Sequence, residues 1–178
     1  MNGPSIDDLL AEYDRALTHT DALWRDLTPD EVRWRPHADF SPIGWHLGHQ
    51  SAVAHFMVRN LTAAEPSPDP DLDPVMDSAH PEARRDEIPD VDRIDRYRTA
   101  VAERVRFRIG NIRDGRVGAP AQLAIVARTL VTALVNHEYQ HSQWIAEVRR
   151  DHLDRALPPA PTSSWLTTID GYTVLLPG

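Results

Sequence analysis

Apolar residues recur every three or four positions along four long stretches of the chain, which is the spacing of one face of an α-helix. The stretches run from Ser5 to about Leu27, from Ser41 to about Leu61, from about Asp92 to Ile112, and from about Pro120 to about Leu153. A short extra helix is expected after Thr28, with Pro29 at its first position and Pro36 at its end. Four long helices without a convincing set of strands predict an all-α four-helix bundle of antiparallel neighbours.

Two segments do not follow this pattern. Residues 62–90 hold six prolines among many aspartates, so we expect one long surface loop with at most one short turn around Val75 to Ala79. Such a connection is compatible with a crossover that lets its flanking helices lie other than as simple up-and-down neighbours. The tail from Ser163 to Leu176 is too apolar for a disordered terminus and should dock on the bundle or on a neighbouring subunit. We therefore expect a bundle over residues 1–157 and a docking tail over 158–178.

Composition removes several kinds of chemistry. The 178 residues carry 19 basic side chains, all arginine, against 27 acidic ones, which gives a formal charge of −8, and there is no cysteine. Disulfides, cysteine-based metal sites, cysteine nucleophiles and lysine Schiff bases are excluded. An acidic chain is a poor partner for nucleic acid. Residues 1–10 do not have the pattern of a secretory signal, and no apolar run is long enough for a membrane span, so we expect a cytoplasmic protein that binds neither membrane nor nucleic acid.

Four of the nine histidines lie in two helical stretches at spacings that suit a metal ion. His137 and His141 are four residues apart on one helix face, and His46 and His49 are three apart on another helix. Bundles build metal sites from side chains on facing helices, and burying unpartnered imidazoles would be costly. Three imidazoles on one side of an ion leave positions open for water and substrate, which is typical of a catalytic site. A lone histidine is more often a satisfied core residue, so we assign no role to the others, His19, His37, His55, His80 and His152.

Glu138 makes the second pair part of an H-E-x-x-H string, in which glutamate is the general base of zinc proteases. That interpretation lacks a third ligand, because Glu147 lies about 240° round the helix from His141. Glu138 itself lies about 100° from the ligand face, which favours a supporting hydrogen bond or a surface contact over the role of base. Trp45 and Trp144 are expected in the core or a pocket wall. The arginines of the third long helix are expected on a solvated face: Arg104, Arg106 and Arg108.

The strings Ser41-Pro42-Ile43-Gly44-Trp45-His46-Leu47-Gly48-His49 and His137-Glu138-Tyr139-Gln140-His141 resemble those of the DinB-like (DinB/YfiT) metalloprotein superfamily. Within this superfamily, the two strings are most similar to those of the N-terminal domain of ergothioneine-synthesis sulfoxide synthases. The resemblance covers residues 5–153. It implies a bundle whose divalent metal is held by His49, His137 and His141. His46 would lie beside these ligands and is the fallback ligand.

The resemblance also implies a choice of activities. The first hypothesis is a thiol-cofactor S-transferase or isomerase of the mycothiol type, in which iron, zinc or nickel lowers the pKa of the cofactor thiol. A non-haem iron oxygenase or a metal-dependent hydrolase would use the same three histidines. A non-enzymatic module with a structural metal is the third reading. A small-molecule substrate is expected, and the sequence leaves a homodimer open. Variable parts of the pocket should come from residues 62–90 and from the tail.

Overall fold

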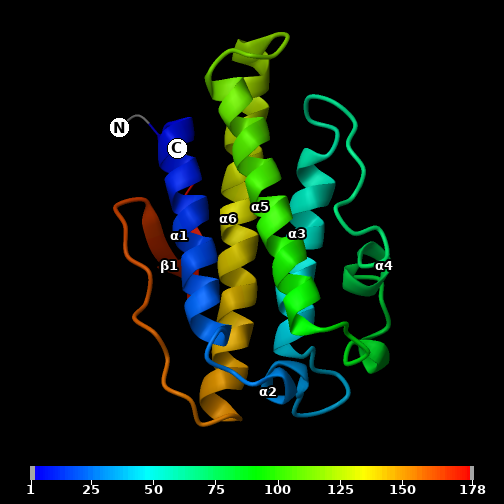
Figure 1. Cartoon of the computed structure of the whole chain (residues 1–178). Helices are drawn as coiled ribbons and strands as arrows, with labels where there is room; N and C mark the ends of the chain where they lie inside the picture. The colour runs from blue at the N-terminus through cyan, green and yellow to red at the C-terminus, as the bar shows by residue number, and fades with distance from the viewer. Residues whose placement is uncertain (1–2, 177–178) are drawn as a thin grey trace.

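Four long helices form the body of the molecule (Figure 1). The computed structural model describes residues 3–176, so the outermost residues of the two expected domains, 1, 2, 177 and 178, lie outside the described residues. The elements are α1 (Ile6–Trp24), α2 (Pro29–Arg33), α3 (Ile43–Val58), α4 (Asp73–Met76), the 3-10 turn η1 (Glu82–Arg84), α5 (Val91–Arg113), α6 (Pro120–Asp151), β1 (Leu166–Ile169) and β2 (Tyr172–Leu175). The predicted all-α bundle is confirmed.

Local sequence signals explain where the first helices begin. Ser5 Oγ accepts the backbone N–H of Asp8, and the Asp8 carboxylate accepts the backbone N–H of Ser5, which forms a capping box. Thr28 and Glu31 form the same reciprocal pair at the start of α2. Two helices end slightly earlier than the apolar pattern predicts. The first, α1, ends at Trp24 rather than near Leu27, and α3 ends at Val58 rather than near Leu61.

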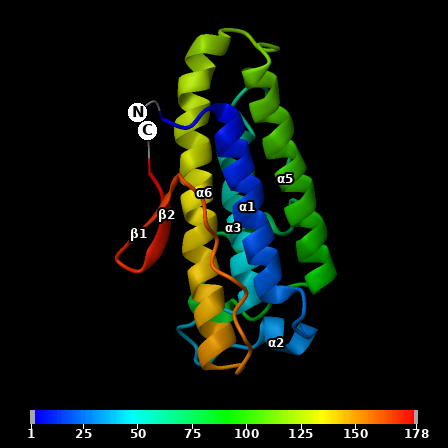
Figure 2. The same ribbon diagram turned by 90° about the vertical axis from the view of Figure 1, so that its left-hand side faces the viewer.

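The order of the helices in space differs from the expected antiparallel arrangement. Cross-helix contacts join Thr20 to Glu138 and Leu23 to Arg149, so α1 and α6 run parallel. Contacts of Leu47 with Arg98 and of His55 with Arg104 make α3 and α5 parallel as well. Figures 1 and 2 show the helix pairs, and Figure 1 shows the long connection that returns the chain from the end of α3 to the start of α5. The crossover that the long connection allows is present, and it makes α3 and α5 parallel. The expectation of antiparallel neighbours is wrong for α1 and α6.

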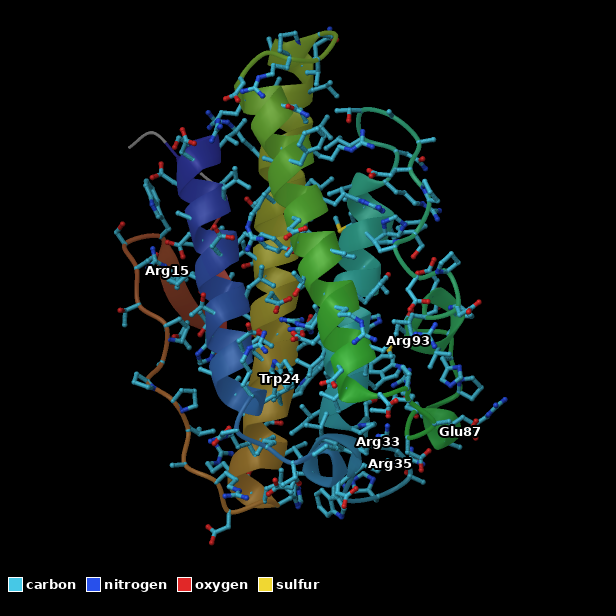
Figure 3. All side chains as sticks on the ribbon, in the orientation of Figure 1. Arg15, Trp24, Arg33, Arg35, Glu87 and Arg93 are labelled. Carbon is cyan, nitrogen blue, oxygen red and sulfur yellow. The ribbon has the colours of Figure 1, made fainter. Side chains whose placement is uncertain are left out.

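The crossover, residues 59–90, contains two short helical turns where at most one was expected. The first, α4, packs on α3 at Gly48, where a Cβ atom would overlap the sulfur of Met76. The crossover is fastened to α5 by arginine ion pairs, including Arg93 with Asp69 at 2.6 Å (Figure 3). Arg104 and Arg108 both pair with Glu65, so these two arginines are largely buried and do not lie on the expected solvated face. Arg106 pairs with Asp14 on the outside of the bundle.

The apolar tail forms a small antiparallel hairpin against α6 (Figure 2). Asp170 and Gly171 connect the strands with positive φ values of 52° and 86°, the backbone that a two-residue turn of type I′ requires. The side-chain amide of Asn136 holds β2, because it accepts the N–H of Leu175 and donates to its carbonyl. The hairpin was not predicted, since each strand is only four residues long. Among the described helices, none combines the length and the apolar content needed to cross a bilayer.

Candidate metal centre

Three histidines come together where α3 crosses α6. One ring nitrogen from each of His49, His137 and His141 lies within 4.8 Å of the other two, and we call these residues the histidine trio. The ring centroids are 4.5 to 5.3 Å apart. His46 lies beside the trio, and its Nδ1 is 2.8 Å from Nδ1 of His141. The structure therefore brings together all four histidines that the sequence singled out.

Burial keeps these rings neutral. It lowers the pKa of His137 to about 4 and that of His46 to about 3, and it lowers the pKa of His49 and His141 as well. Repulsion between neighbouring rings acts in the same direction on His46, His137 and His141. Neutral imidazole is the form that offers a lone pair to a metal ion.

Hydrogen bonds engage Nδ1 of two trio members. Nδ1 of His49 lies 2.7 Å from the carbonyl oxygen of Met76, so Nδ1–H donates and Nε2 remains free. Nδ1 of His141 shares a hydrogen bond with Nδ1 of His46, and Nε2 of His141 is free for a metal ion when His141 is the donor in this bond. Ligating histidines in metalloproteins usually have such a partner on the second nitrogen.

An aromatic stack holds the ring of His49 from its other side. The indole of Trp45 lies parallel to the His49 ring, with centroids 4.6 Å apart and an angle of 9°. Its Nε1–H donates to the carbonyl of Val75. The guanidinium carbon of Arg85 lies over the indole, 3.9 Å from the ring centroid, and the guanidinium donates to the carbonyl of Ser78. The Arg85–Trp45–His49 stack therefore ties the crossover to the trio.

Substituting Arg85 tests this stack. In Arg85→Met the indole loses its cation–π partner and the crossover loses a hydrogen bond, so the His49 ring is less well oriented. We expect divalent-metal affinity to fall by roughly tenfold, the lower end of the effect of residues that support metal ligands. A competition titration with a chromophoric chelator measures the change. Arg84→Met is the matched control, because Arg84 is exposed and, within residues 3–176, its ion pair is with Glu87 alone. Equal affinity in the two variants would show that the stack does not support the site.

Glu138 points away from the trio into the centre of the bundle. Its carboxylate lies 3.1 Å from the Arg98 guanidinium and accepts a hydrogen bond from Thr20, while its backbone carbonyl accepts from Gln50. These residues come from α6, α5, α1 and α3, so one buried network joins all four long helices. Glu138 is 4% exposed, so it does not make the expected surface contact. The partners of its carboxylate, Thr20 and Arg98, are not members of the trio. A carboxylate engaged in this way is poorly placed to act as a general base.

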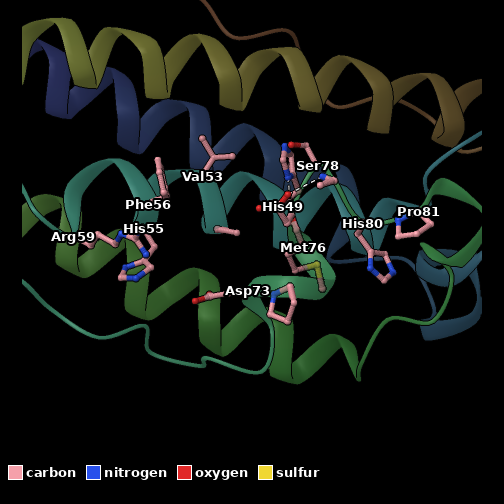
Figure 4. A pocket seen from close by; sticks show the side chains of 14 residues that line it. His49, Val53, His55, Phe56, Arg59, Asp73, Met76, Ser78, His80 and Pro81 are labelled. Carbon is pink, nitrogen blue, oxygen red and sulfur yellow. Dashed lines mark hydrogen bonds between the residues drawn. The ribbon is translucent and has the colours of Figure 1, made fainter.

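Two hollows reach the trio. The larger, about 910 Å³, lies between α3 and residues 73–81 of the crossover and touches the trio at His49 (Figure 4). The smaller, about 540 Å³, lies between α6 and the hairpin and touches it at His137. The crossover and the tail thus both contribute to the walls, as the sequence suggested. Trp144 packs edge-on against His141, with ring centroids 4.7 Å apart, and so borders the trio.

Sequence reasoning missed three contributors to this region. Met76 acts through its backbone carbonyl, which leaves no trace in side-chain type, and Arg85 lies in a loop without a motif. His55 was assigned no role, yet it is buried and lines the larger hollow. The sequence feature that could have indicated a role for His55 is its place on the same histidine-rich helix as His49. His19, His37 and His152 are outside both hollows, whereas His80 lies on the rim of the larger one.

A buried cluster of histidines inside a four-helix bundle defines a candidate helical metalloprotein. A profile of the DinB superfamily matches residues 12–145, which include all of the trio and most of the four long helices. The chain therefore belongs to the DinB superfamily, whose members are known for binding metals. A search of curated proteins found no match.

The residues present fit a divalent ion. Three neutral imidazoles converge, Nδ1 of His49 and Nδ1 of His141 are engaged in hydrogen bonds, and a ligand set of three nitrogens suits zinc, iron or nickel. Cysteine cannot contribute, because the chain has none. The structure thus supports a divalent-metal site of the superfamily type.

Proposed function

We propose that the protein is a metal-dependent enzyme that binds a divalent ion through His49, His137 and His141 and activates a low-molecular-weight thiol for transfer or isomerisation. The observation that carries this proposal is the convergence of three neutral imidazoles beside a hollow large enough for a small molecule. Structural metal sites are usually closed by four protein ligands, whereas catalytic ones keep a position free. Within residues 3–176, the trio is the one group of at least three histidines or carboxylates whose ligand atoms lie close enough together to share an ion. It offers only three ligand atoms.

The absence of cysteine favours a thiol supplied from outside. A bound divalent ion would lower the pKa of such a thiol and keep it as a thiolate at neutral pH. The chain's own residues prepare the site for this. The Met76 carbonyl orients His49, His46 orients His141, and Trp45 and Trp144 keep bulk water from the rings.

A conjugation assay tests the proposal. The purified protein is loaded with zinc, nickel or anaerobic iron(II) and mixed with mycothiol and the electrophile monochlorobimane, whose thiol adduct is fluorescent. We expect metal-dependent acceleration over a protein-free blank and over His137→Ala, which should lose a ligand. His152→Ala is the matched control, since His152 is exposed at the end of α6.

Two outcomes would overturn the proposal. Absence of acceleration with every metal would remove thiol transfer to this class of acceptor. Oxygen uptake by the iron-loaded protein on addition of a thiol, without conjugation, would assign the site to oxygenase chemistry. A hydrolase would instead release product from esters or amides in the absence of any thiol.

The remaining sequence-based expectations are part of the same proposal. We infer a small-molecule substrate, a cytoplasmic location and no nucleic-acid partner, and the formal charge of −8 supports the last of these. A homodimer is tested by light scattering during size-exclusion chromatography.

A further inference from the structure

The larger hollow has a polar end that the trio does not explain. His49 touches it near the middle of α3, while His55 in the last turn of α3 and Arg59 just after it line the hollow further along (Figure 4). Six residues separate His49 from His55, which corresponds to about 9 Å along a helix axis. A ligand atom at His49 and a polar group at His55 would therefore belong to an elongated molecule.

His55 offers this end a fixed hydrogen-bond donor. The side chain is only 3% exposed, and its Nδ1 accepts a hydrogen bond from Arg104 at 2.9 Å. The proton of the neutral ring must then lie on Nε2. Burial and the positive charge of Arg104 lower the pKa of His55, which keeps the ring neutral. Within residues 3–176, no hydrogen-bond partner is found for Nε2, and this atom is not one of the fully buried unpaired side-chain atoms. Because His55 lines the hollow, its N–H donor is accessible there and has no acceptor in the described part of the chain.

Arg59 adds a free positive charge. Sixteen of the 19 arginines make ion pairs within the described part of the chain, and Arg59 is one of three that do not, with Arg96 and Arg128. Its guanidinium lies 4.5 Å above the ring of Phe56, which is 65% exposed at the rim. An unpaired arginine beside an exposed aromatic ring is a typical recognition surface for a carboxylate with an apolar neighbour.

The acidic residues that line the hollow, Asp73 and Asp77, accept hydrogen bonds from other groups of the chain. Asp73 accepts hydrogen bonds from the Tyr97 hydroxyl and from Ser67, and Asp77 accepts the backbone N–H of Ala79. Between the two ends the walls are mainly apolar, with Val53, Phe56, Pro74 and Met76. The hollow thus combines a metal-ligand end, an apolar middle and an end with two unused donors.

We propose that this hollow binds an elongated thiol whose anionic group, a carboxylate or a group of similar charge, is held by His55 and Arg59 while its sulfur reaches the metal side at His49. The proposal rests on the proposed thiol function and adds the class of substrate. Arg104 acts as a positioning residue, because its hydrogen bond fixes the His55 ring with Nε2–H as the donor.

The test uses the cobalt(II)-loaded protein, in which thiolate binding is seen as a charge-transfer absorption band. Two pairs of thiols are titrated, each differing only in the far end: mercaptooctanoate with mercaptooctanol, and mercaptopropionate with mercaptopropanol. We expect mercaptooctanoate to bind about tenfold more tightly than mercaptooctanol, as for a hydrogen bond to a charged group. The short pair should show no such preference, because its carboxylate cannot reach His55.

Variants assign the preference to these residues. Arg59→Gln should reduce the advantage of mercaptooctanoate severalfold and leave mercaptooctanol unchanged. Arg96→Gln is the matched control, since it removes another unpaired arginine that does not line the hollow. Arg104→Gln should weaken the advantage as well, because the ring of His55 loses its partner. Melting curves with bound cobalt establish that the variants are folded.

The outcomes separate this inference from the proposed function. If no thiol produces the charge-transfer band, the thiol function itself is wrong and the substrate class falls with it. If both long thiols bind equally, thiol binding stands and the anionic end is refuted. A preference that survives in Arg59→Gln would also refute the assignment to this end of α3.

Discussion

Replacing His141 with alanine is expected to abolish tight binding of a divalent metal. His141 is the member of the trio closest to both others, with ring centroids 4.5 Å from His137 and 4.9 Å from His49, and it also contacts His46. Its removal leaves two ligands, which is fewer than zinc sites in proteins normally use. The loss should exceed the roughly 10–100-fold reduction caused by changing the partners of ligands.

Metal content after purification and a competition titration measure this effect. His19→Ala is a suitable control, because His19 lies on α1 and contacts Tyr139 rather than the trio. The variant should stay helical, since the core of the bundle does not include the metal, but it should lose the increase in melting temperature that bound metal gives to the native protein. Full metal occupancy in His141→Ala would contradict the assignment. Unfolding of the variant would favour a purely structural metal.

Removing one partner of the buried Arg98–Glu138 pair is expected to destabilise the fold strongly. In Arg98→Met the Glu138 carboxylate stays buried without its counter-charge, which typically costs about 3–5 kcal/mol. Glu138→Leu should cause a smaller loss, because the buried Arg98 guanidinium keeps its hydrogen bonds to Leu47 and Gln50 and its ion pair with Asp21. The double variant should recover much of the loss, because two apolar side chains leave no buried charge.

Urea unfolding followed by circular dichroism measures these differences in the free energy of unfolding. Arg150→Ala is the control, since its pair with Asp151 is exposed and should contribute at most about 1 kcal/mol. If Glu138 were instead a general base, Glu138→Leu would lose activity with unchanged stability. A loss in both single variants that the double variant does not reduce would contradict the ion-pair explanation.

The sequence was informative about elements and less so about their directions. Apolar periodicity placed all four long helices, because each buries one face against the others. It did not determine that α3 and α5 run parallel. The pattern of apolar positions on a helix is the same whether the neighbouring helix runs parallel or antiparallel to it. The short hairpin escaped because four-residue strands give little alternation, and its stability depends on the Asn136 side chain, more than thirty residues away.

The candidate site shows the same division. The spacing of His137 and His141 and the histidine pair on another helix were enough to predict that these two helices bring their histidines together, and the family resemblance selected His49 rather than His46 as the third ligand. The residues that orient them were not predictable, because Met76 acts through its backbone and Arg85 through a loop. Arg98 did leave a signal, since it lies four residues after Ile94 on the apolar stripe of α5, where an arginine needs a buried partner.

The parallel pairing of helices also affects how the protein folds. Thr20 and Glu138, which touch in the core, are 118 residues apart in sequence, and His46 and His141 are 95 apart. Folding slows as the sequence separation of contacts grows, so this bundle should fold more slowly than an up-and-down bundle of equal length. During synthesis the first three long helices emerge without the histidines of α6. The nascent protein can therefore capture its metal only after α6 has left the ribosome.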